Sequence, residues 1–243
     1  MNKITSLFSY FSSGFALTNK SFDIYLISLA LLLLFELPSL PLDFSLSVVL
    51  SLLSTIGLAV NFGFSISIPV FLLQKQQDKP LDLRRVVSVT IQNTKRAILP
   101  LFYLFILGII FLVFLVIFLH PTREQAWQFF QDWANSGNKD PRLLILPIIL
   151  SFFVFTSFLF SLEQRGFFRS MKDSVLLSFR NLPYLVLIII IEAVSWSVIS
   201  FLPSSEFWSQ FLRYVISLYI SLVIAASTLF YYQRVVKGEK NNV

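Results

Sequence analysis

One stretch of the chain joins a basic amphipathic segment directly to an apolar run, and this combination constrains the fold most. Between Arg165 and Arg180, large apolar residues recur at helical spacing while basic residues occupy the other faces, which is typical of a helix in a membrane interface. From Leu182 to Leu202 the only charged residue is Glu192. This run has about the 20 residues that a helix needs to cross the hydrocarbon core. The stretch therefore predicts an interfacial helix followed by a membrane span.

The composition extends this prediction to the whole chain. Hydrophobic residues make up 56% of the sequence and charged residues only 13%, which lies outside the range of soluble globular proteins. Too little polar sequence remains for a separate soluble domain, so we expect residues 1–243 to form a single integral membrane domain. Cysteine is absent, which excludes disulfides and thiolate metal sites.

Apolar runs of this kind predict an all-α fold, a polytopic bundle of six transmembrane helices with basic amphipathic interfacial helices. The predicted spans cover 22–40, 45–73, 98–119, 143–162, 182–202 and 211–232. Amphipathic segments with basic residues precede three of them, at 1–20, 75–96 and 165–180. The connection 121–142 is predicted to hold a further short interfacial helix. Small residues at every fourth position predict close helix contacts, at Gly57, Asn61 and Ser65 and again at Ser217, Ser221 and Ala225.

Basic residues are distributed unevenly between the two sides of the predicted spans. Fifteen of the 19 Lys and Arg residues fall in the N-terminal segment, the connections after the second and fourth spans, and the tail. The other side holds Arg123, Lys139, Arg142 and Arg213. Because cytoplasmic loops carry the excess of Lys and Arg, both termini are predicted to lie in the cytoplasm.

The pattern of an interfacial helix followed by a two-span hairpin recurs along the chain. It divides the sequence into three units, 1–74, 75–162 and 163–243. A duplication explains this threefold repeat, and so does convergence, since each unit has to enter the membrane by the same chemistry.

Two short stretches carry a resemblance to known proteins. The first, LEQRGFFRSMKDSVLLSFRNLPYLVLIIII, has an acidic residue, a glycine and a basic amphipathic run that ends in Asn181 before a span. The second, LFYYQRVVKGEK, has the pair Tyr231 and Tyr232 followed by Arg234, with Gln233 where the group often has Asp. Both resemble the pattern of bacterial six-helix membrane proteins that are similar to the membrane domain of glycerophosphoryl diester phosphodiesterases. The resemblance implies the bacterial cytoplasmic (inner) membrane and no activity, because the catalytic phosphodiesterase domain of the fused members is missing here.

Glu192 is the main candidate for an intramembrane polar site, together with Asn61. A carboxylate at the middle of a span costs about 2.5 to 3.5 kcal/mol on insertion scales, so it usually faces a partner or a cavity. One interpretation is a proton or cation site. The other, which we favour, is a protonated or hydrogen-bonded carboxyl that packs against Asn61 or Ser195.

The remaining polar residues of the predicted spans indicate no enzyme. Glu36 and Arg213 lie near the outer ends of their spans, where they could form an ion pair or extend separately to the interface. His120 has no second ligand at metal spacing, so no metal site is expected. The motifs GxSxG and HExxH and a phosphate-binding glycine loop are all missing from the sequence.

The basic residues beside the spans indicate the partner. A net charge of +6 would suggest nucleic acid in a soluble chain, but here anionic lipid headgroups are nearer. The candidate headgroup contacts are Arg84, Arg85, Lys95, Arg96, Arg165, Arg169, Lys172 and Arg180.

Two functional classes follow from these observations, and neither needs a cofactor. The first is a non-enzymatic structural or accessory membrane protein that interacts with lipid, with a protein partner or a second copy of the chain as further candidates. The second is a small transporter or channel that uses Glu192. Transporters usually have broken helices and several intramembrane polar groups. The sequence predicts only one kinked span, at Pro69, and one central acid, so the first class is favoured.

Overall fold

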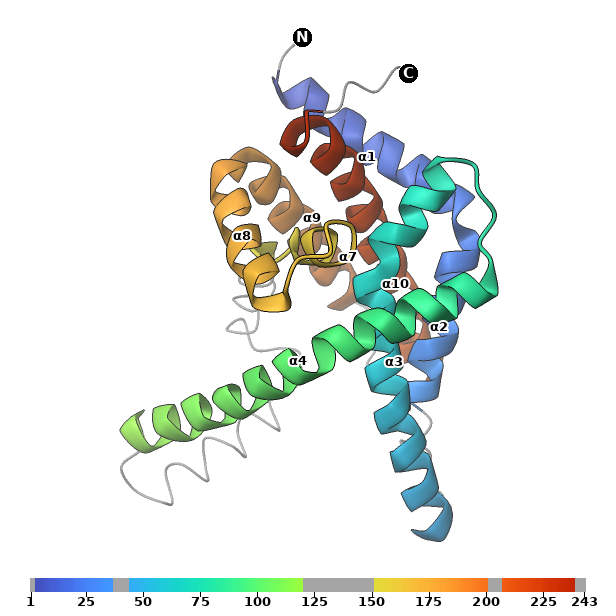
Figure 1. Ribbon diagram of the computed structural model, residues 1–243, viewed down its shortest axis with the longest axis vertical. Helices are drawn as coiled ribbons and strands as arrows, with labels where there is room; N and C mark the ends of the chain where they lie inside the picture. Colours follow the sequence, from blue (N-terminus) through green and yellow to red (C-terminus); the bar gives the residue numbers. More distant parts are fainter. Residues whose placement is uncertain (1–2, 37–43, 120–150, 201–206, 239–243) are drawn as a thin grey trace.

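The computed structural model describes residues 3–36, 44–119, 151–200 and 207–238, and all regular elements in these ranges are helical (Figure 1). Helices are expected here because a chain in lipid has to satisfy its backbone hydrogen bonds internally. The predicted all-α fold is confirmed for these ranges. The elements are α1 (Lys3–Lys20), α2 (Phe22–Glu36), α3 (Phe44–Gln76), α4 (Leu83–Leu119), α7 (Thr156–Ser161), α8 (Phe167–Arg180), α9 (Leu182–Ser200), α10 (Phe207–Tyr231) and the π-helical turn η4 (Tyr232–Val236).

Four helical segments in the described ranges are long and apolar enough to cross a membrane. They are Gly57–Gln76, Leu83–Ile110, Leu182–Ile199 and Phe211–Val236. Helices α1 and α2 meet at a bend of 74°, and this pair makes a fifth candidate if it counts as one span. Within the described residues, the structure therefore contains four or five helices that are long and apolar enough to cross a membrane, whereas the sequence predicts six spans over the whole chain.

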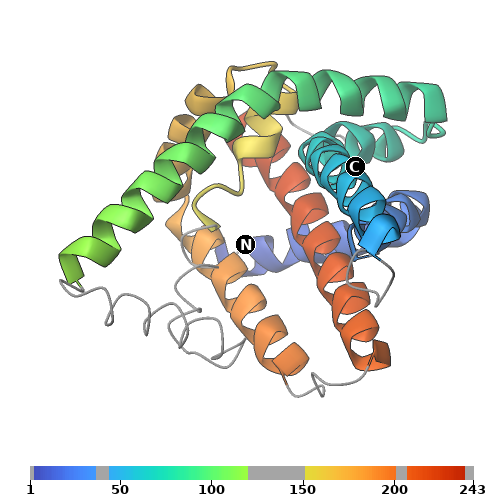
Figure 2. The same cartoon turned by 90° about the horizontal axis from the view of Figure 1, so that it is seen from below.

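The predicted third span is part of a longer helix. We expected a basic segment over 75–96 and then a span that begins at Ile98, with Pro100 in its first turn. Instead α4 runs without interruption from Leu83 to Leu119, and Pro100 lies inside it. Proline cannot donate to the preceding turn and bends a helix, and Figure 2 shows α4 bending along its length. The second half of α4 extends away from the other helices in Figure 1.

The predicted fourth span, 143–162, is not one continuous helix in its described part. Residues 152–155 form turns, and α7 that follows has only six residues. Hydropathy alone did not reveal this break, because the residues on both sides of it are apolar. The beginning of this predicted span, 143–150, and the predicted interfacial helix in 121–142 lie outside the described residues.

Two helix pairs cross at glycines. A Cβ atom at Gly14 of α1 would lie 2.6 Å from the backbone nitrogen of Ser227 in α10. A Cβ atom at Gly63 of α3 would lie 3.0 Å from the backbone oxygen of Thr90 in α4. Both crossings therefore require a residue without a side chain at that position.

The predicted small-residue stripes are not the ones that make these close contacts. On α3 the contact uses Gly63 and Ser67, whose hydroxyl accepts a hydrogen bond of 2.9 Å from Asn93 Nδ2, while the predicted Ser65 is exposed. On α10 the predicted Ser217 and Ser221 are exposed as well. Small residues occupy more than one face of each helix, and the spacing does not tell which face meets a neighbour.

The buried core is rich in aromatic rings. Tyr184 of α9 stacks on Tyr231 of α10 with ring centroids 3.9 Å apart, and Tyr10 of α1 meets Tyr231 edge to face at 5.4 Å. Phe155, directly before α7, contacts the rings of Tyr184, Tyr231 and Tyr232. This aromatic part of the core lies where the end of α10 meets α1, α7 and α9.

Candidate functional site

Helix α8 packs its serines and Phe167 against the protein and directs Phe168 and Phe179 outward. The buried residues of α8 are Phe167, Ser170, Ser174 and Ser178, which recur at helical spacing. Phe168, Leu176 and Phe179 are about half exposed, at 49%, 48% and 56%. A helix on a soluble protein buries its apolar face, so this arrangement is the reverse of the ordinary one. Of the apolar face predicted from the sequence, Phe168 and Phe179 are exposed.

The serine face of α8 supplies hydrogen bonds to the broken segment 152–155. The hydroxyls of Ser174 and Ser178 each donate to the backbone oxygen of Phe152 at 3.0 Å. The backbone N–H of Phe155 donates to the hydroxyl oxygen of Ser174 at 3.1 Å. A non-helical backbone in an apolar region needs such partners, since each buried group left without one is costly. The serines of α8 therefore make the break possible.

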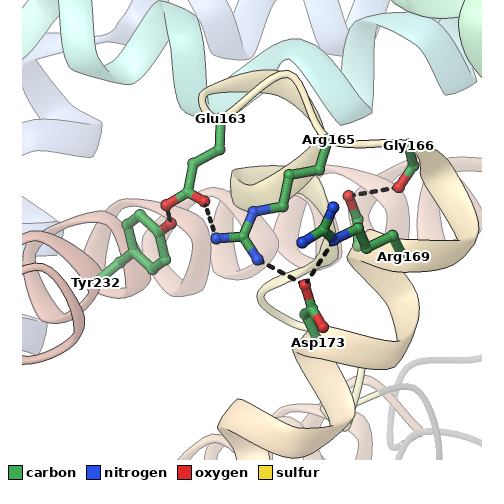
Figure 3. Close-up of polar contacts among 7 residues, drawn as sticks. Glu163, Arg165, Gly166, Arg169, Asp173 and Tyr232 are labelled. Carbon is green, nitrogen blue, oxygen red and sulfur yellow. Dashed lines mark hydrogen bonds and ion pairs between the residues drawn. The ribbon is translucent and has the colours of Figure 1, made fainter.

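A network of charges holds the turn between α7 and α8 (Figure 3). Arg165 pairs with Glu163 at 2.5 Å and with Asp173 of α8 at 2.6 Å, and Asp173 also lies 3.8 Å from the Nε of Arg169. Burial lowers the pKa of the Arg165 guanidinium, but its hydrogen bond with Asp173 and the charge of Glu163 outweigh this effect and raise the pKa. Arg165 therefore remains a cation that joins the turn to α8.

Arg96 of α4 fixes the same turn from the other side. Its guanidinium donates to the side-chain oxygen of Gln164 at 2.6 Å and to the backbone oxygen of Arg165 at 2.9 Å. It also lies over the ring of Phe160, 4.4 Å from the centroid. Gln164 has a φ of 56°, a left-handed conformation that is strained for a residue with a side chain. Arg96 stabilises this strained turn.

The two stretches that carry the family resemblance contact each other. The hydroxyl of Tyr231 donates to the side-chain oxygen of Asn181 at 2.7 Å, and the hydroxyl of Tyr232 donates to Glu163. Figure 3 shows Tyr232 and Arg165 on opposite sides of the Glu163 carboxylate. The end of α10 is thus attached to both ends of the segment that contains α8. The two stretches lie about 50 residues apart in the sequence, and their motifs did not predict this contact.

The predicted headgroup contacts fall into two groups in the structure. Arg96 and Arg165 are half buried and bonded to protein groups, as described above. Arg84, Arg85 and Lys95 of α4 and Arg169, Lys172 and Arg180 of α8 are exposed. Exposed apolar residues lie among the basic residues of α4, namely Leu83, Val87 and Ile91.

Glu192 has a partner that the sequence did not indicate. The hydroxyl of Ser151, directly before the broken segment, donates to the Oε2 of Glu192 at 2.8 Å. Of the two partners considered from the sequence, Ser195 donates instead to the backbone oxygen of Ile191, and Asn61 is half buried in α3. Asn61 and Glu192 form no hydrogen bond with each other in the described part of the chain.

Two further predictions from the sequence concern an ion pair between Glu36 and Arg213 and the binding of metal. The side chain of Glu36, the last residue of α2, lies outside the described part, so its pairing with Arg213 of α10 stays a prediction. The described residues contain no group of three or more His, Cys, Asp or Glu side chains that could hold a metal ion.

Comparison with known proteins adds no functional assignment to this geometry. The chain matches no protein-family model, no curated protein sequence and no solved structure.

Proposed function

We propose that this protein is a non-enzymatic integral membrane protein of a structural or accessory kind that binds anionic lipid through basic helices at the cytoplasmic surface of the bacterial inner membrane. The observation that carries the proposal is the orientation of α8, with the serines toward the protein and Phe168 and Phe179 outward. Arg169, Lys172 and Arg180 flank these phenylalanines and are exposed. An apolar strip among cations matches the boundary between acyl chains and anionic headgroups.

The first half of α4 supports the same proposal. Arg84, Arg85 and Lys95 are exposed on it beside exposed apolar residues, and the helix continues directly into an apolar segment. Basic residues next to a span lie within reach of lipid phosphates, and each is worth about 1 kcal/mol near an anionic surface.

The proposal is tested by reversing charges on both helices. A variant with Arg84, Arg85, Arg169 and Lys172 all changed to Glu is solubilised from vesicles of mixed anionic and zwitterionic phospholipid, and the lipid that stays bound is quantified. We expect the wild-type protein to retain anionic lipid in excess and the variant to lose this excess, because each position contributes about 1 kcal/mol.

The matched control exchanges Lys and Arg at the same four positions and so keeps the charge. It should retain the anionic excess. Equal enrichment in the wild-type protein and the charge-reversed variant would contradict the proposal.

A second candidate function, a small transporter or channel, is favoured by one observation. The Ser151 hydroxyl reaches the Glu192 carboxyl at the point where the chain ceases to be helical. Transporters place polar residues beside broken helices near the middle of the membrane. We rank this candidate second because, in the described residues, the site holds one carboxyl with one serine partner. The flux experiment in the Discussion distinguishes the two.

A further inference from the structure

We propose that anionic lipid bound at the outer face of α8 controls the conformation of the broken segment 152–155. The outer face consists of Phe168, Leu176 and Phe179 with Arg169, Lys172 and Arg180. The inference rests on the proposed function, since it requires that this face binds lipid.

The position of α8 in the chain places its outer face at a membrane surface. Helix α8 ends at Arg180, and the candidate span Leu182–Ile199 begins after one residue, Asn181. One residue spans only about 3.3 to 3.6 Å, so the end of α8 lies where the span enters the membrane. The occupant of the outer face is therefore lipid, and the cations on this face select anionic headgroups.

The inner face of the same helix holds the broken segment. Ser174 and Ser178 bond the backbone oxygen of Phe152, and Ser174 accepts the N–H of Phe155. Phe155 is buried, 1% exposed, so water does not replace these bonds while α8 is docked. If α8 moves away, the backbone of the break loses these partners. We therefore expect the break to be less ordered when α8 is not docked against it.

Lipid binding and docking are coupled because both need the same placement of α8. Docking turns the serines inward and leaves Phe168, Phe179 and the cations facing lipid. A ligand that binds the docked state better than the undocked state shifts the equilibrium toward docking. Such coupling is reciprocal, so lipid orders the break, and an ordered break strengthens lipid binding. Ser151, whose hydroxyl donates to Glu192, directly precedes this segment. Ordering of the break therefore also fixes the position of Ser151.

The matched variants come from the serine face itself. Ser174→Ala combined with Ser178→Ala removes the bonds to the break. Ser170→Ala is the control, because Ser170 is equally buried but its hydroxyl donates to Gly166 at the start of α8. Hydrogen exchange of the Phe155 N–H is measured by mass spectrometry on full-length protein in purely zwitterionic vesicles and in vesicles with added anionic phospholipid.

We expect exchange in the wild-type protein to be slower on anionic vesicles by at least about fivefold, the lower end of usual coupling between two sites. The Ser170→Ala variant should keep this ratio of exchange rates between zwitterionic and anionic vesicles. The double variant should bring the ratio to one. If the double variant does not fold, Ser178→Ala alone should reduce the ratio.

The outcomes separate this inference from the proposed function. Equal exchange on both vesicles, with anionic enrichment still present, overturns the inference and leaves the proposed function standing. Loss of the ratio in Ser170→Ala as well overturns the specific role of Ser174 and Ser178. If wild-type protein shows no anionic enrichment at all, both proposals fail.

Discussion

At the scale of single residues, the closest contacts between helices depend on glycines, which have no side chain. Gly14 lies in the middle of α1, where glycine is normally less favourable than alanine by about 1 kcal/mol. Here the backbone of Ser227 occupies the space that a Cβ atom would need, so glycine permits α1 and α10 to cross closely. The contact involves the backbone of Ser227 as well as its hydroxyl, so no rotamer change of Ser227 relieves it.

We expect Gly14→Ala to destabilise the protein. The added Cβ would lie 2.6 Å from the Ser227 nitrogen, so the helices have to move apart. Overpacking of this kind costs about 1 to 3 kcal/mol, which outweighs the gain in helix propensity. Thermal unfolding in detergent, followed by circular dichroism, should show a lower Tm.

Gly108→Ala is the control for that measurement, because Gly108 is also inside a helix but has no atom within 4 Å of its Cβ position. Its Tm should equal or exceed that of the wild-type protein. A Gly14→Ala protein as stable as Gly108→Ala would show that α1 and α10 do not cross at Gly14.

At the scale of elements, α8 and the broken segment depend on each other. The serines of α8 replace the helical hydrogen bonds that residues 152–155 lack. Without these serines, a continuous apolar helix would be the better solution for this stretch. The break also places Ser151 against Glu192 of α9.

Glu192→Gln tests what this contact does. Gln has the same size, and its amide oxygen can accept the hydrogen bond from Ser151, so the variant removes only the ionisable group. For a structural or accessory protein we expect nearly unchanged thermal stability and no flux of ions or protons into reconstituted vesicles with either protein.

Ser151→Ala, which removes the donor instead, should lower the Tm slightly, since a hydrogen bond of this kind contributes about 0.5 to 1.5 kcal/mol. A flux that the wild-type protein carries and Glu192→Gln loses at equal stability would establish the transporter in place of the accessory protein.

At the scale of the whole molecule, every proposal about the surface needs an orientation in the membrane, and the distribution of basic residues predicts one. The count of Lys and Arg predicts that the exposed cations of α4 and α8 lie on the same side of the membrane. The bent pair α1 and α2 is fastened at its corner by ion pairs, between Lys20 and Asp78 and between Lys75 and Asp23 at 2.5 Å. These pairs keep the α1–α2 corner beside the end of α3.

Reporter fusions test this orientation. Two reporter enzymes are fused at each site, one that is active only in the cytoplasm and one that is active only in the periplasm. After Lys75 we expect only the cytoplasmic reporter to be active, and after Asn138 only the periplasmic one, because the excess of basic residues stays in the cytoplasm. A fusion after Lys237 is the cytoplasmic control. Activity of both test fusions on the same side would refute the predicted topology.

The sequence by itself determined that the chain is helical and apolar enough to span a membrane, because segment length and hydropathy depend on neighbouring residues only. It also singled out α8 and the two stretches around Asn181 and Tyr231. The tertiary structure decided which face of α8 points inward, that Tyr231 reaches Asn181, and that Ser151 meets Glu192. It also placed a break at residues 152–155, within the described part of the predicted fourth span. These features depend on contacts between residues far apart in the chain, and the spacing within one segment carries no information about them.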